Sequence, residues 1–131
     1  MSETRSTTDG SPIPVRTAGL AAALGVWVLW SGVVLTGHGT IILNNFLVGA
    51  AIAAGGAFVA AWPDGGPLPA VAVPVLVAVL GIWIAAAPFV LAAGSDLLLW
   101  SNVIAGLLVA VLAAGSVYGS WQLTQSTATR A

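Results

Sequence analysis

The chain has no cysteine and very little charge. The absence of cysteine excludes disulfide bridges, thiolate metal sites and CxxC redox chemistry. Only 5% of the 131 residues are charged and 59% are hydrophobic, and the mean hydropathy is +1.04. A water-soluble domain needs more charge to cover its surface, so that class is excluded. The formal net charge of −1 provides no basic surface, which excludes nucleic acid as a partner.

Four long hydrophobic runs fill most of the chain. Each run has roughly the 20 residues that an α-helix needs to cross the hydrocarbon core of a bilayer. The predicted spans are residues 17–36, 41–62, 69–92 and 97–121. A secretory signal peptide is the alternative for the first run, but this run is longer than the roughly 7–15 apolar residues of a signal peptide. We therefore predict an all-α protein with four transmembrane helices.

The second half of the chain repeats the first. The matched pairs are Gly25 with Gly81, Trp27 with Trp83, Asn45 with Asn102 and Gly49 with Gly106, and one residue is inserted between the second and third pairs. A repeat of this length fits one hairpin of two apolar helices. With four spans, both hairpins enter the membrane from the same side. They are therefore parallel repeats and differ from the inverted repeats of many transporters.

The few charged residues predict the orientation. Arg5, Arg16 and Arg130 all lie on the side of the membrane that holds both termini and the middle loop. The positive-inside rule then predicts a multi-pass protein of the cell membrane with both termini in the cytoplasm. The predicted parts are a disordered cytoplasmic tail (1–16), a first transmembrane hairpin (17–62), a cytoplasmic loop (63–68), a second transmembrane hairpin (69–121) and a cytoplasmic tail (122–131).

Small residues at a spacing of four predict helix packing. They are Asn45, Gly49, Ala53 and Ala57 in the second span and Asn102, Gly106, Ala110 and Ala114 in the fourth. Residues i and i+4 share a helix face, and small side chains let helix backbones approach closely in lipid. We predict that these two spans pack through these faces. The alternative is that alanine and glycine are simply abundant, so that such runs arise from composition alone.

The two asparagines at the start of these stripes are predicted to be polar links. Each amide would bond a neighbouring helix or loop carbonyl, at typically about 0.6 kcal/mol for such a bond in a membrane. The functional alternative is a contact to a substrate or an ion.

Trp62, Trp121 and Trp100 fall at span ends and fit the interfacial aromatic belts. Trp27 and Trp83 fall deeper, where an indole N–H needs a hydrogen-bond partner.

Several single residues are expected to have structural roles and no chemical function. Pro88 lies inside the third span and is expected to kink it. Ser95 or Asp96 is expected to cap the fourth span, and Asp64 is expected in a turn. His38 is the only histidine, and a haem or metal site would usually need more ligands than this chain supplies. We therefore expect His38 to be a solvated loop residue and assign no metal, cofactor or catalytic residue.

The predicted spans contain no Asp, Glu, Lys or Arg. Such residues mark proton relays and ion-coupling sites inside membranes. Their absence argues against small four-helix multidrug exporters, which depend on a membrane-embedded carboxylate, and against proton-translocating rotor subunits.

The second hairpin also carries a recognisable set of motifs. It reads Gly81-Ile82-Trp83, then Ala87-Pro88-Phe89, then Trp100-Ser101-Asn102 and Gly106. This order resembles the SPW-repeat family of small prokaryotic membrane proteins, whose one or two hairpins are named for a Ser-Pro-Trp element. Ala87-Pro88-Phe89 stands where that element would be, and Ser31-Gly32-Val33 stands there in the first hairpin, so both copies are diverged. The repeat signature consists of Gly25, Trp27, Gly81, Trp83, Pro88 and Trp100. The resemblance implies a membrane location and this hairpin architecture over about residues 20–121, but no activity.

The sequence favours a non-enzymatic membrane protein. We expect a structural or accessory subunit that contacts membrane lipid and packs against copies of itself or against other membrane subunits. Ala21-x-x-x-Gly25 and Gly115-x-x-x-Gly119 provide further close-approach faces for such contacts. One alternative is a small oligomeric channel or transporter for an uncharged or lipophilic solute, which would need a polar stripe along a span. A membrane enzyme is the last alternative, since the chain shows no nucleophile–base pair, metal cluster or cofactor motif.

Overall fold

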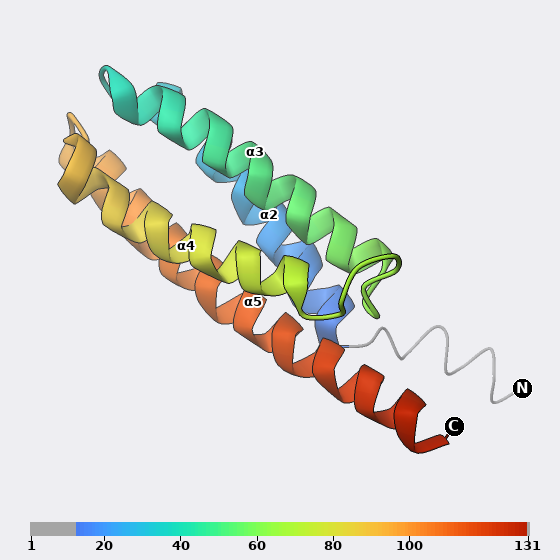
Figure 1. Cartoon of the computed structure of the whole chain (residues 1–131). Helices are drawn as coiled ribbons and strands as arrows, with labels where there is room; N and C mark the ends of the chain where they lie inside the picture. Colours follow the sequence, from blue (N-terminus) through green and yellow to red (C-terminus); the bar gives the residue numbers. More distant parts are fainter. Residues whose placement is uncertain (1–12, 131) are drawn as a thin grey trace, which may run out of the picture.

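Between residues 13 and 130, the chain folds into four helices joined by short connections. The computed structural model describes the backbone of residues 13–130 and the side chains of residues 15–119, 121 and 122. The helices are α2 (Ile13–Val34), α3 (Thr40–Ala61), α4 (Ala72–Leu91) and α5 (Asp96–Arg130). Residues 13–130 contain no strand. The predicted all-α fold with four helices is confirmed (Figure 1).

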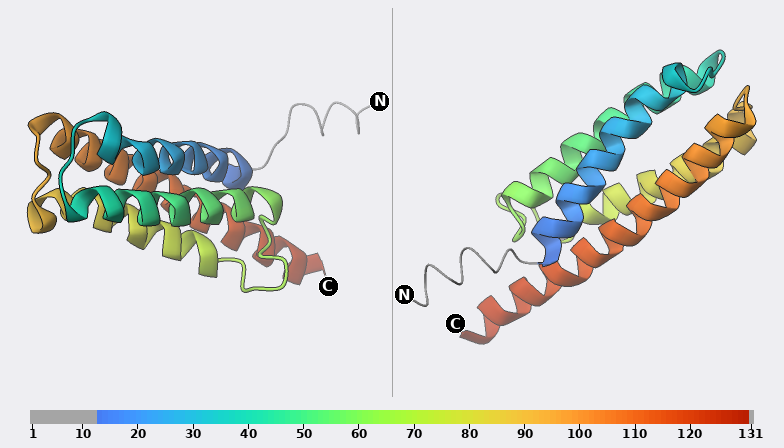
Figure 2. Two further views of the ribbon diagram at one scale, coloured as in Figure 1. Left: turned by 90° about the horizontal axis from the view of Figure 1, so that it is seen from above. Right: turned by 180° about the vertical axis from the view of Figure 1, so that it is seen from behind.

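The helices pair as two hairpins, α2–α3 and α4–α5, which lie side by side in one bundle (Figures 1 and 2). Helix α2 lies against α3 and α5, and α4 lies against α5 and α3, so α2 is diagonal to α4 and α3 is diagonal to α5. The α2–α3 and α4–α5 turns meet at one end of the bundle, the loop end. The start of α2, the end of α5 and the α3–α4 link lie at the other, the terminal end. Both hairpins therefore run in the same direction, as expected for parallel repeats.

All four helices are long and apolar enough to cross a membrane. The candidate spans are Val15–Val34, Thr40–Ala61, Ala72–Leu91 and Asp96–Gly119. Each span falls within a few residues of its predicted range. The chain is therefore a multi-pass membrane protein by the length and composition of its helices.

The two predicted tails are helical where the structure describes them, which corrects the disorder predicted for residues 13–16. Helix α2 begins at Ile13, so residues 13–16 are helical and only residues 1–12 of the predicted disordered tail lie outside the described part. Helix α5 continues to Arg130, so the predicted tail 122–131 is helical as far as the structure describes it. Extending an existing helix by one residue costs far less than starting one, and residues 120–130 contain neither glycine nor proline to end it.

The helix ends at the loop end follow the predicted turn chemistry. Ser95 Oγ accepts a hydrogen bond from the Leu98 backbone N–H at 3.1 Å, so Ser95, and not Asp96, caps α5. Helix α2 closes with a bond from the Gly37 N–H to the Gly32 carbonyl at 2.8 Å. The intervening Thr36 is left-handed (φ 59°), and this arrangement is a Schellman motif with a non-glycine residue at its left-handed position.

Pro74 and Pro88 lie in α4, and Asp64 lies in the α3–α4 link. Pro74 lies in the first turn of α4, where the missing N–H has no partner to lose. Asp64 Oδ1 accepts the Gly66 N–H at 3.1 Å and so forms a turn in the α3–α4 link. Pro88 lies inside α4 and removes one helical hydrogen bond, to the carbonyl of Ile84. The kink expected at Pro88 stays a prediction.

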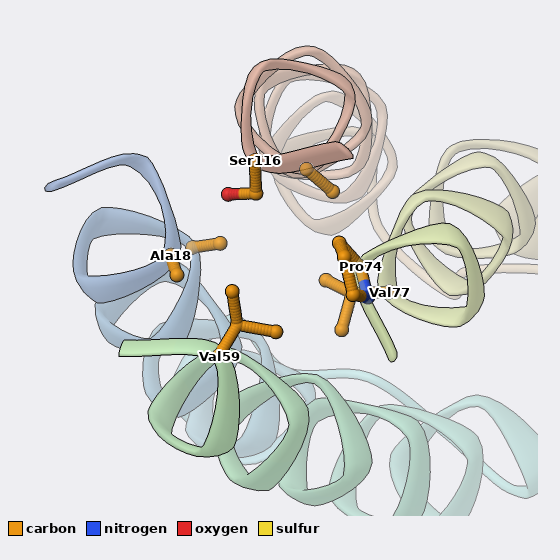
Figure 3. A pocket seen from close by; sticks show the side chains of 8 residues that line it. Ala18, Val59, Pro74, Val77 and Ser116 are labelled. Carbon is orange, nitrogen blue, oxygen red and sulfur yellow. The ribbon is translucent and has the colours of Figure 1, made fainter. Parts of the chain in front are cut away.

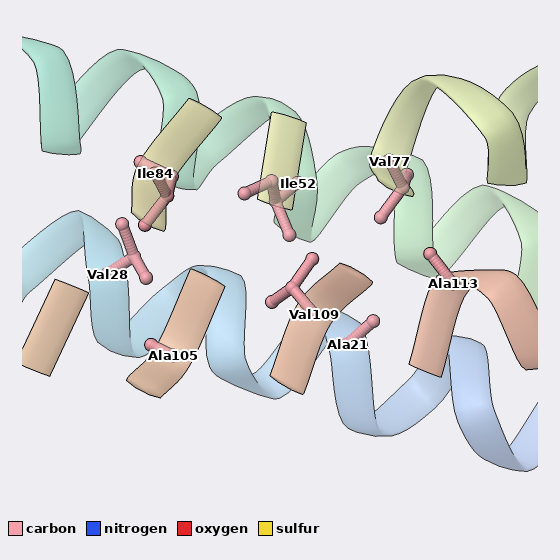
Figure 4. Packing of buried hydrophobic residues seen from close by; sticks show 8 residues of the cluster. All are labelled: Ala21, Val28, Ile52, Val77, Ile84, Ala105, Val109 and Ala113. Carbon is pink, nitrogen blue, oxygen red and sulfur yellow. The ribbon is translucent and has the colours of Figure 1, made fainter. Parts of the chain in front are cut away.

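The core runs along the bundle axis and is built from small and β-branched side chains. All four helices contribute to the main cluster (Figure 4). Its members are Ala21 and Val28 from α2, Ile52 from α3, Val77 and Ile84 from α4, and Ala105, Val109 and Ala113 from α5. A second cluster of Ile41, Ala87, Ala93 and Leu98 lies towards the loop end. Buried residues on each helix recur at spacings of three and four, which is the seam of a helical bundle.

Candidate functional site

Glycines let the two helices of each hairpin pack backbone against backbone. A Cβ atom on Gly25 would lie 2.5 Å from the Ala53 nitrogen, and a Cβ on Gly49 would lie 2.5 Å from the Leu29 nitrogen. In the second hairpin, a Cβ on Gly81 would lie 2.8 Å from the Ala110 nitrogen. Hence only glycine lets α2 meet α3, and α4 meet α5, at this distance.

The small-residue stripes therefore act differently from the prediction. Helices α3 and α5 are diagonal: Asn45 and Asn102 bond each other, but the glycines of the stripes do not pack between these two helices. Each stripe instead faces the partner helix of its own hairpin, as Gly106 does where a Cβ would lie 2.5 Å from the Ala85 nitrogen of α4.

The stripes are also shorter than predicted. Gly49 and Gly106 are buried, Ala53 and Ala110 are half-buried, and Ala57 and Ala114 are exposed, as the burial of each residue shows. A step of four residues turns about 40° beyond one full turn of a helix, so a strict spacing of four drifts off the packed face after two steps. The buried face continues through Ile52 and Gly56 in α3 and through Val109 and Ala113 in α5.

A reciprocal amide pair joins the two hairpins at the centre of the bundle. Asn45 Nδ2 donates to Asn102 Oδ1 at 2.8 Å, and Asn102 Nδ2 donates to Asn45 Oδ1 at 3.0 Å. Both side chains are fully buried. The two residues are equivalent in the repeat, so this pair lies on the approximate two-fold axis that relates the hairpins. The expected polar link is present, and its partner is the equivalent asparagine.

The amide pair has one unequal feature. Asn45 Nδ2 gives its second hydrogen to Ser31 Oγ at 3.0 Å, and Ser31 Oγ in turn donates to the Val28 carbonyl at 2.8 Å. The position equivalent to Ser31 in the second hairpin is Ala87, which has no hydroxyl. Within the described residues, the second amide hydrogen of Asn102 has no acceptor.

Two tryptophans add a second pair of links around the amides. Trp27 Nε1 donates to Ser101 Oγ at 2.9 Å, and Trp83 Nε1 donates to Asn44 Oδ1 at 2.8 Å. Both bonds cross from one hairpin to the other. They are equivalent in the repeat, because Trp27 corresponds to Trp83 and Ser101 corresponds to Asn44. The need of these two indoles for a partner, predicted from their depth, is confirmed.

Sequence reasoning did not name the acceptors of these indoles. Asn44 and Ser101 occupy equivalent positions, each directly before an asparagine of the central pair. Both are polar in otherwise apolar helices, and this shared polarity was the available signal. Asn44 Nδ2 also donates to Asn45 Oδ1 at 3.3 Å, so the indole and amide links form one connected layer.

Further polar contacts join the hairpins at both ends. At the loop end, Ser95 Oγ donates to the Leu35 carbonyl at 2.8 Å. At the terminal end, Thr17 Oγ1 and Ser116 Oγ lie 2.6 Å apart and share a hydrogen bond. The hairpins are thus tied by hydrogen bonds at three levels along the bundle.

The terminal end of the core is apolar and tightly packed. Eight side chains from all four helices surround a narrow gap, and they are Ala18, Ala21, Gly56, Val59, Pro74, Val77, Ala113 and Ser116 (Figure 3). The gap has no room for a water molecule. On the outside, a groove of about 470 Å³ runs between α2 and α5 and is lined by Leu20, Ala23, Leu24, Leu108, Val111 and Leu112.

The remaining predicted residues lie at the ends of the bundle. His38 is exposed at the loop end, where a Cβ atom on Gly94 would lie 2.7 Å from its Nδ1 atom. Trp100 is exposed near the same end, and Trp62 and Trp121 are exposed at the terminal end. Among the described residues, no three His, Cys, Asp or Glu side chains come close enough to hold a metal ion.

Fold and interface together define a class: a multi-pass membrane protein made of two equivalent hairpins joined by a buried polar layer. The chain belongs to the SPW repeat family, because the family model described as "SPW repeat domain" matches residues 16–116. The match runs across both hairpins and ends within α5. No curated protein and no solved structure matches the chain.

Proposed function

We propose that this chain is a non-enzymatic structural or accessory subunit of the cell membrane, with both termini in the cytoplasm. It acts through helix–helix contacts with copies of itself or with a larger membrane complex. One observation carries the proposal: the buried polar side chains of the spans bond one another across the hairpin interface. Asn45 and Asn102 bond each other across this interface, Ser31 bonds Asn45 within the first hairpin, and all three side chains are fully buried.

The outer surface supports contacts with other helices. Ala57 on α3 and Ala114 on α5 are exposed, although both continue a stripe of small residues. Gly19 on α2 is also exposed, and a Cβ there would meet nothing within 4 Å. Faces of this kind let a neighbouring helix approach closely in lipid. Lipid chains are the competing occupants of the same faces.

The alternative of a channel or transporter receives less support from the packing. The amide layer and the apolar gap below it fill the centre of the four-helix bundle, so a path through one chain would have to break them. A solute path would therefore have to run between copies, along surfaces formed mainly by hydrophobic side chains.

The test is cross-linking from the exposed small-residue faces in native membranes. The chain contains neither lysine nor cysteine, so a photoreactive amino acid is introduced at Ala57 or at Ala114 in the full chain. Matched controls carry it at Val79 or Leu107, which are also exposed but lie outside the stripes. We expect adducts of defined mass from the first two positions, and an oligomer or stoichiometric complex by native mass spectrometry in nanodiscs. A monomer in nanodiscs with no adduct above the controls would contradict the proposal.

A further inference from the structure

The loop-end half of the hairpin interface is self-complementary. Asn45 pairs with its own equivalent, Asn102, and the Trp27–Ser101 bond has its equivalent in the Trp83–Asn44 bond. An interface of this kind has the form that a symmetric dimer uses, in which the same patch serves both partners. The surface of the first hairpin that binds the second hairpin can therefore bind a hairpin of another chain in the same way.

The terminal-end half of the interface distinguishes the two hairpins. Around the gap, three of the four equivalent pairs carry the smaller residue in the first hairpin: Ala18 against Pro74, Ala21 against Val77, and Gly56 against Ala113. The fourth pair, Val59 against Ser116, goes the other way and offsets only part of this difference. Two first hairpins would leave empty space there, and two second hairpins would crowd it. Both errors are destabilising. Small side chains on one hairpin therefore select the larger ones on the other.

The central layer disfavours one of the two like pairings, that of two second hairpins. Two second hairpins would bring together two copies of Asn102 and no copy of Ser31, so two buried amide hydrogens would lack an acceptor. An unsatisfied buried donor costs about 1–3 kcal/mol. A first hairpin paired with a second hairpin leaves only one such hydrogen.

The link between the hairpins is long enough to join two bundles. It runs from Trp62 to Val71, between the end of α3 and the start of α4, and most of its residues are exposed. About ten extended residues reach roughly 30 Å. A helix with its side chains is about 10–12 Å across, so this reach covers the distance to a neighbouring bundle.

We propose that the chain's partner is a second copy of itself and that the two copies exchange hairpins. The first hairpin of one copy packs against the second hairpin of the other, which gives a dimer of two bundles that keep every contact between helices described above. This inference rests on the proposed function, because it names one form of the self-association proposed there. Hairpin exchange differs from contacts between the outer surfaces of two bundles, because the copies are joined through the buried interface between a first and a second hairpin.

The test places cysteines across the buried interface in two full-length chains that are co-expressed with different tags. One chain carries Thr17→Cys and the other Ser116→Cys, since these two hydroxyls are 2.6 Å apart. The matched control pairs Thr17→Cys with Val59→Cys, because Val59 is the first-hairpin equivalent of Ser116 and reports pairing of two first hairpins. We expect a mixed disulfide of twice the 13.0 kDa chain mass, several-fold more abundant for the first pair.

A single chain with both Thr17→Cys and Ser116→Cys shows that the pair can form a disulfide. If it does not, Leu35→Cys and Ser95→Cys, whose native contact lies at the loop end, replace it in every arm. A disulfide within the double-variant chain but none between chains, or equal yields in the two mixed pairs, overturns hairpin exchange. Adducts from Ala57 or Ala114 would still support the proposed function in that case, so the two failures are distinguishable.

Discussion

The central amide pair shows how one missing hydroxyl affects a buried layer. Asn45 uses both amide hydrogens, on Asn102 and on Ser31, whereas Asn102 uses only one. The difference arises because alanine stands at position 87, where the repeat would place the equivalent of Ser31. Since the backbone around Ser31 accommodates a hydroxyl, its equivalent in α4 is expected to do the same.

We predict that Ala87→Ser stabilises the bundle. The added hydroxyl would accept the free amide hydrogen of Asn102, and a hydrogen bond of this kind contributes about 0.5–1.5 kcal/mol to the free energy of unfolding. The control is Ala86→Ser, which adds the same group at the preceding, exposed position. Reversible unfolding in mixed micelles measures both variants. A variant at position 87 that is no more stable than the control would show that Asn102 already has an adequate partner.

At the scale of helices, each hairpin depends on glycines where two backbones meet. The four glycines at these contacts, Gly25, Gly49, Gly81 and Gly106, face backbone atoms of the neighbouring helix. A backbone cannot move aside as a flexible side chain can, so an added methyl group must push the helices apart.

We predict that Gly49→Ala destabilises the chain by about 1–3 kcal/mol through overpacking. The Cβ would lie 2.5 Å from the Leu29 nitrogen. The matched control is Gly19→Ala, which meets nothing within 4 Å and should stabilise α2 by about 0.5–1 kcal/mol, because alanine is the better helix former. Unfolding in the same micelles measures both. Similar effects of the two changes would remove the argument that α2 and α3 meet at their backbones.

The sequence predicts the elements better than their contacts. Hydrophobic runs of about 20 residues locate all four spans, because bilayer thickness sets helix length directly. The repeat predicts which residues share an environment, such as Asn45 and Asn102. It does not predict that these two residues touch, because contact depends on how the hairpins pack. The stripe through Ala57 was extended too far because the helical period is 3.6 and not 4.

For the whole molecule, we predict that the loop end lies outside the cell and the terminal end lies in the cytoplasm. His38 and Asp64 are both exposed, at the loop end and in the link at the terminal end respectively. We expect His38→Cys to react with a membrane-impermeant maleimide in intact cells, and Asp64→Cys to react only after permeabilisation. The chain has no cysteine of its own, so each variant reports one site. The reverse pattern would place the termini outside the cytoplasm and contradict the orientation derived from arginine.

The approximate two-fold axis inside one chain has a consequence for how the protein can change over generations. In a dimer of identical hairpins, each substitution at the axis appears twice, and both sides must tolerate it together. Here the two sides are encoded separately, so Ser31 and Ala87 differ, as do Gly32 and Pro88. A loss on one side is partly covered by the intact side, as the single unpaired hydrogen of Asn102 illustrates. Fusion of the hairpins thus lets one half adapt while the other preserves the fold.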